Sequence, residues 1–148
     1  MTSKDVSRRE SGQLAVASAT LGPWRAAAVT GVVGGAAALG IDLITLHWSA
    51  SLLAGPVGMA LFLFFAVGGI GSVVSRRGGD QRLRHWAREH PWQVAAAPAG
   101  AFFVTDLIAR GLLSGQVWAS IWTSLWQGVI LAAVIGVVGS VTASRRRA

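Results

Sequence analysis

Long apolar stretches alternate with short polar segments along the chain after about its first 23 residues. The apolar stretches cover about residues 26–48, 52–74, 94–113 and 117–142. Each is long enough to cross a hydrocarbon core of roughly 30 Å as a helix, which takes about 20 residues. An irregular backbone could not satisfy its hydrogen bonds at that depth. The pattern therefore predicts an all-α integral membrane bundle of four helices.

The polar segments define the expected domain organisation. Residues 1–23 are expected to form a polar tail, and residues 24–148 a membrane domain whose central loop covers 75–93. Every lysine and arginine except Arg110 lies in the tail, at Arg25, in the loop or within the last four residues. Because basic residues stay on the cytoplasmic side, both termini and the central loop are predicted to be cytoplasmic.

Composition extends this prediction to the membrane and its lipids. The heavy use of Arg, Ala, Gly and Val, with a single Lys, is typical of a bacterial genome rich in G and C. We therefore expect a multi-pass protein of a bacterial inner membrane. The net charge of +7 is accounted for by the topology and by anionic lipid at the cytoplasmic face. No nucleic-acid partner is expected.

Similar segments recur in the two halves of the chain. The pair Pro23-Trp24 returns as Pro91-Trp92, and Gly71-Ser72-Val73 returns as Gly139-Ser140-Val141, both 68 residues later. The run Asp42-Leu43-Ile44 returns as Asp106-Leu107-Ile108, but 64 residues later. These matches predict two tandem two-helix hairpins of the same orientation. The alternative is chance similarity between helices rich in alanine and glycine.

Small residues recur every four positions on two of the predicted spans, which lets helix backbones approach closely in lipid. Asp42 lies seven positions after Gly35 and so about 20° from that stripe, facing a helix interface. The residues expected to pack helices together are Gly31 and Gly35 on the first span, and Gly128, Ala132, Gly136 and Ser140 on the fourth.

Ionisable residues inside the spans are the main candidates for function, because a charge in a bilayer is costly. Asp106 and Arg110 are spaced for an ion pair on one helix face. Arg110 either bridges both acids or leaves Asp42 to be protonated. A polar stripe on the fourth span is expected at the same depth, so that three spans form one polar cluster. Its predicted members are Asp42, Asp106, Arg110, Ser120, Thr123, Ser124 and Gln127.

Other chemistry is poorly represented in the sequence. Without cysteine there is no thiolate metal site, and the histidines lack acids at ligand spacing, so neither a metal nor a cofactor is expected. No nucleophile elbow, zinc-protease motif or phosphate-binding loop occurs, and no enzyme activity is expected. The stripe of Trp118, Trp122 and Trp126 indicates lipid anchoring or, alternatively, an aromatic wall for a partner or ligand.

Two classes of function remain. The first is a non-enzymatic accessory or scaffold subunit that forms a homo-oligomer or joins a larger complex for secretion, conjugative transfer or envelope assembly. The alternative is a small transporter, channel or lipid-linked flippase that uses the buried Asp and Arg cluster.

Overall fold

The computed structural model describes residues 3–45, 52–74, 85–87 and 89–145, with side chains from Glu10 onward. Within these ranges the main elements are all helices. Their bounds are α1 (Ser3–Ala19), α2 (Trp24–Ile44), α3 (Ala54–Val74), α5 (Pro91–Ser114) and α6 (Val117–Ser144). The last four are long and apolar enough to cross a membrane.

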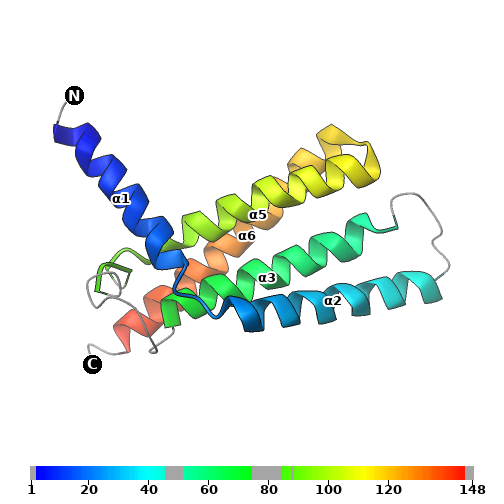
Figure 1. Ribbon diagram of the computed structural model, residues 1–148, viewed down its shortest axis with the longest axis horizontal. Coiled ribbons are helices and arrows are strands. Elements are labelled where there is room, and N and C mark those ends of the chain that lie inside the picture. Colours follow the sequence, from blue (N-terminus) through cyan, green and yellow to red (C-terminus); the bar gives the residue numbers. More distant parts are fainter. Residues whose placement is uncertain (1–2, 46–51, 75–84, 88, 146–148) are drawn as a thin grey trace.

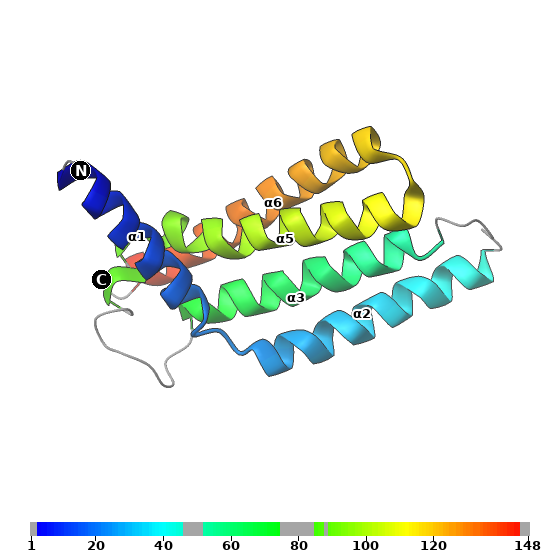
Figure 2. The same ribbon diagram turned by 45° about the horizontal axis from the view of Figure 1, so that its top comes forward.

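The four long helices lie side by side, with successive helices running in opposite directions (Figure 1). α2 packs against α3 alone, whereas α3 also packs against α5 and α6, and α5 packs against α6. Figure 2 shows α2, α3 and α5 as neighbours in that order, with α6 beyond α5. The start of α2 and the end of α6 lie at one end of the bundle. α2 is therefore the least covered of the four helices.

The core lies where α3, α5 and α6 meet. Phe102 of α5 is fully buried, and its ring lies edge-on to Phe62 and Phe65 of α3, with centroids 5.8 and 6.2 Å apart. Leu131 and Ile135 of α6 complete the buried group. Such edge-to-face aromatic pairs add about 0.5–1.5 kcal/mol beyond area burial in water. These rings tie the first pair of helices to the second.

The same helix contacts recur in the two pairs at their shared end. A Cβ on Gly68 would collide with the ring of Trp24, and one on Gly136 would collide with the ring of Trp92. Both members of the first contact are 68 residues before those of the second. Gly71 against Pro23 and Gly139 against Pro91 repeat the relation. Each Pro-Trp pair thus lies at the start of a helix and packs against glycines of the following helix.

The correspondence continues into the middle of the bundle. Gly31 and Gly35 of α2 face Ala60 of α3. At positions 68 residues later, Ala99 and Phe103 of α5 face Gly128 of α6. The glycines are on the first helix of the first pair and on the second helix of the second pair, but the positions that meet are equivalent. By this register Arg110, rather than Asp106, is the position equivalent to Asp42, so the spacing of 64 between the acids is not the one that the contacts follow.

α1 was expected only as part of a polar tail, yet it is a helix of 17 residues. It crosses one end of the bundle and packs against α5 and α3 (Figure 1). Ala15, Ser18 and Ala19 are buried in this contact. These small side chains allow close packing without a continuous apolar stripe, which explains why periodicity did not indicate the helix.

The observed helix bounds differ modestly from the predicted spans. α5 begins at Pro91, three residues earlier than expected, because proline suits the first helical turn, where a missing N–H costs little. Pro98 lies inside the same helix. Gly115 ends α5 with φ +66°, a conformation that favours glycine, and only Gln116 separates it from α6. The last residues of the predicted first span, 46–48, and loop residues 75–84 lie outside the described residues.

Candidate functional site

An ion pair lies inside the bundle between two residues of α5. The Nε of Arg110 donates a hydrogen bond to Oδ2 of Asp106 over 2.8 Å. Asp106 is fully buried, and the Arg110 side chain is 17% exposed. The two residues are one helical turn apart, so the helix itself holds them in register. The pair cancels its net charge within a single span.

Two polar side chains of α6 extend this pair into a network. Ser124 is fully buried, and its hydroxyl donates to Oδ2 of Asp106 over 2.7 Å. The Nη2 of Arg110 donates to Oε1 of Gln127 over 3.1 Å. Each charge is therefore bonded both within α5 and across to α6. Charge-assisted bonds of this kind are stronger than neutral ones, especially away from water.

α3 contributes space to the network rather than a polar side chain. Gly58 lies against the ion pair, where a Cβ would collide with Arg110 Nη2 and would come within 3.0 Å of Oδ1 of Asp106. A glycine at this position lets the guanidinium lie against the α3 backbone. The sequence did not single out Gly58, because spacing along one helix shows which residues share a face but not what lies opposite.

One oxygen of the buried carboxyl lacks a hydrogen bond. Oδ1 of Asp106 is the one buried side-chain polar atom without a partner among the described residues. An unpaired buried acceptor costs roughly 1–3 kcal/mol in soluble proteins. The network therefore leaves one buried acceptor without a hydrogen bond.

Asp42 does not join this network, contrary to the expected cluster of three spans. It lies on α2, which does not touch α5 or α6 among the described elements. Within the described part of the chain, its carboxyl forms no hydrogen bond or ion pair, and a Cβ added at Gly55 of α3 would lie 3.7 Å from its Oδ2. Asp42 is partly exposed. Arg110 does not bridge the two acids.

The predicted polar stripe of α6 divides into two parts. Ser120 is buried near the network, and its hydroxyl bonds to the Gln116 carbonyl and lies 3.4 Å from the Ser114 hydroxyl. Thr123 instead donates to the Ala119 carbonyl of its own helix and takes no part. A threonine can satisfy its hydroxyl on the preceding turn, so a polar residue at the right depth need not join a polar site.

The small residues predicted to pack helices are placed as follows. Gly31, Gly35, Gly128 and Gly136 are buried, the first two against α3 and the others against α5. Ala132 is partly buried. Ser140 is also partly buried and donates to the Gly136 carbonyl. Glycine thus marks the close contacts more sharply than alanine or serine does.

The tryptophan stripe of α6 faces outward. Trp118, Trp122 and Trp126 are 86%, 71% and 61% exposed. No residue of α2, α3 or α5 covers them to any large extent. This placement suits lipid, a partner or a ligand, the alternatives that the sequence left open.

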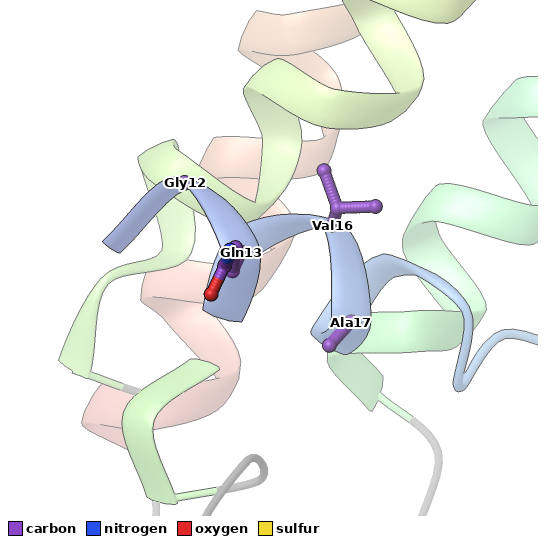
Figure 3. Close-up of a pocket in the computed structure, with 4 residues that line it drawn as sticks. All are labelled: Gly12, Gln13, Val16 and Ala17. Carbon is purple, nitrogen blue, oxygen red and sulfur yellow. The ribbon is translucent and has the colours of Figure 1, made fainter. Parts of the chain in front are cut away.

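Outside the network, the described residues provide little that resembles a ligand site. They contain no group of three or more acidic or histidine side chains that could hold a metal. A shallow depression on α1 is lined by Gly12, Gln13, Val16 and Ala17 of one helix alone (Figure 3). Near the central loop, Trp86 stacks on His90, and His85 pairs with Glu89 over 3.2 Å at the exposed surface. None of these features brings several functional groups together in one place.

Comparisons with protein-family models, with curated proteins and with solved structures gave no match for this chain.

Proposed function

We propose that this chain is a non-enzymatic accessory or scaffold subunit of a membrane complex, with Asp106 and Arg110 joining α5 to α6 as a structural fastening. The observation that carries the proposal is the internal compensation of the buried pair. Both charges are bonded to each other and to α6, and α3 lies against the pair at Gly58. Breaking such a pair is costly, whereas a substrate site needs groups that are free to exchange partners.

The proposed location is a bacterial inner membrane, with both termini cytoplasmic. Four apolar helices of alternating direction place the start of α2 and the end of α6 at the same face. The basic residues of the tail, central loop and C-terminus then share the cytoplasmic side, as the positive-inside rule requires. The short turn after α5, which contains Gly115 and Gln116, is uncharged and lies on the opposite side.

The test is purification of the tagged chain from native membranes in a mild detergent, followed by native mass measurement. A scaffold subunit is expected to run as a homo-oligomer or together with a defined partner. A monomer that carries a solute or lipid across reconstituted vesicles would contradict the proposal.

A second candidate, a small transporter, channel or lipid-linked flippase, is favoured by two acids that lack full compensation. Asp42 has no cation among the described residues, and Oδ1 of Asp106 has no hydrogen bond there. This candidate predicts that Asp42→Asn together with Asp106→Asn abolishes transport in vesicles and leaves insertion and folding intact. Loss of the folded protein in the same double variant would support the fastening instead.

A further inference from the structure

The α3–α5 interface joins the two helix pairs and has definite members. Phe102 of α5 lies between two aromatic rings of α3, and glycines flank this aromatic group on both sides. The α3 side is formed by Gly58, Phe62, Phe65 and Gly69, and the α5 side by Pro98, Phe102, Asp106 and Arg110. Since the contacts inside each pair correspond at a spacing of 68, each side of this interface has a counterpart elsewhere in the chain.

The counterpart of the α3 side is an uncovered face of α6. Adding 68 to each position gives Trp126, Ile130, Ala133 and Val137. All four are exposed, with Trp126 at 61% and Val137 at 52%. We call these four residues the α6 face. In α3 the same positions receive a further helix, whereas in α6 they receive none of the other described helices.

The counterpart of the α5 side is a face of α2 that α3 covers only in part, since a Cβ on Gly34 would collide with the Leu63 side chain. Subtracting 68 from each position gives Thr30, Gly34, Ala38 and Asp42, which we call the α2 face. These residues are exposed or partly exposed, and α2 contacts only α3 among the described helices. The chain therefore carries both halves of a second interface of the α3–α5 type, and the described helices α2 and α6 do not join them within one copy.

The two faces are complementary in size. In the existing interface, small Gly58 of α3 makes room for Asp106 and Arg110. In the second interface the sizes are exchanged, because bulky Trp126 on α6 would lie opposite Ala38 and Asp42. Ile130 and Val137 would likewise lie opposite Gly34 and Thr30. Small residues on one helix and large ones on the other allow close packing in lipid.

Chemical complementarity accompanies this fit. The Asp42 carboxyl has no hydrogen-bond donor among the described residues of its own chain. The indole N–H of Trp126 can only donate, so it matches a carboxyl acceptor. Desolvating Asp42 without a donor would be costly inside a bilayer. The position of Trp126, equivalent to that of Gly58, places such a donor beside Asp42.

We infer that the α6 face of one copy binds the α2 face of a second copy, head to tail, in the manner in which α3 binds α5 within the chain. The inference rests on the proposed scaffold function and names its partner. A second copy is the occupant because both faces belong to this chain and both are counterparts of an interface that it already forms. A head-to-tail contact leaves one free face of each kind at the ends, so copies add until a ring closes or a row continues.

The test uses disulfide trapping, which the absence of native cysteine makes clean. Positions 30 and 137 are the counterparts of Pro98 and Gly69, where a Cβ on the glycine would lie 3.2 Å from Pro98 Cγ. That proximity is within reach of a disulfide. One tagged copy carries Thr30→Cys, a differently tagged copy carries Val137→Cys, and both are oxidised together in native membranes. The matched control replaces Thr30→Cys by Val32→Cys, about 160° round the helix.

We expect a disulfide-linked dimer that carries both tags when Thr30→Cys is mixed with Val137→Cys, and no such dimer when Val32→Cys is mixed with Val137→Cys. Adding Ala38→Leu to the first copy should abolish the link, because the larger side chain would meet Trp126, whereas Ala37→Leu should leave it unchanged. Links between two copies of Thr30→Cys, without the mixed product, would show a two-fold interface and overturn the inference.

The same samples on native gels separate this inference from the proposed function. A defined complex with a different protein, without the mixed disulfide, would overturn the head-to-tail contact and leave the scaffold proposal standing. A chain that is monomeric in both native and oxidised samples would overturn both.

Discussion

At the scale of single residues, the behaviour of a charge depends on what its neighbours bond to. Asp106 is fully buried and bonded to Arg110 and Ser124, whereas Asp42 is partly exposed with no bonded partner among the described residues. The sequence matched the two acids, because both follow an apolar run and precede Leu-Ile, but it placed a cation one helical turn away only for Asp106. The contact with Ser124 of α6, which no local motif encodes, adds to the difference.

Removing one member of the ion pair should destabilise the protein strongly. Asp106→Leu leaves the Arg110 cation buried without an anion, and the expected loss in unfolding free energy is about 3–5 kcal/mol. The double variant Asp106→Leu with Arg110→Leu should recover most of that loss, because no charge is left uncompensated. Denaturation in detergent micelles, followed by circular dichroism, measures both. Asp42→Asn serves as the comparison, and an equally large loss there would contradict the distinction between the acids.

Gly58 provides the second prediction at this scale. Gly58→Ala should reduce the unfolding free energy by about 1–3 kcal/mol, because its Cβ would displace the Arg110 guanidinium. Gly100 is the matched control, since it lies in α5 with nothing within 4 Å of an added Cβ. Gly100→Ala should be neutral or stabilise by up to about 1 kcal/mol. Similar losses for both variants would show that the space at Gly58 is not used by the ion pair.

At the scale of helices, the apolar pattern predicted the spans well because a bilayer dictates their length. The existence of four long apolar helices is confirmed. The helix at α1 could not be predicted, because its buried residues are small and its remaining surface is polar. The polar site was predicted in part. Ser124 and Gln127 bond to the pair, while Thr123 satisfies itself on its own helix.

The repeated contact between tryptophan and glycine leads to a prediction about helix pairing. A double-mutant cycle between Trp24→Ala and Gly68→Ala should give a coupling energy of the same sign and similar size as one between Trp92→Ala and Gly136→Ala. Contacts between residues that touch typically couple by about 0.5–3 kcal/mol. The readout is unfolding free energy in the same detergent. Pairing Trp24→Ala with Gly40→Ala should give no coupling, since an added Cβ at Gly40 meets nothing within 4 Å. A coupling confined to one helix pair would argue against a common origin of the two hairpins.

At the scale of the whole molecule, the proposed topology can be measured directly on intact cells. Single cysteines at Gln13, Gln116 and Ser144 lie at exposed positions in a chain that otherwise has none. With both termini cytoplasmic, a membrane-impermeant thiol reagent should label only Gln116→Cys, whereas a permeant reagent should label all three. Labelling of Gln13→Cys or Ser144→Cys by the impermeant reagent would show the opposite orientation and contradict the proposed topology. The sequence alone predicts this orientation from its basic residues, but not which helix faces remain open.

The position of the ion pair on one helix also affects how the protein enters the membrane. Asp106 and Arg110 are a single turn apart on α5, so each charge has its counter-charge before any other helix has formed. A lone charge at the centre of a span adds roughly 2.5–3.5 kcal/mol to the free energy of insertion by the translocon. A span that carries its own neutralising partner can leave the translocon sideways without waiting for α6. Separating the two residues onto different helices would therefore be expected to slow biogenesis, even where the finished bundle still folded.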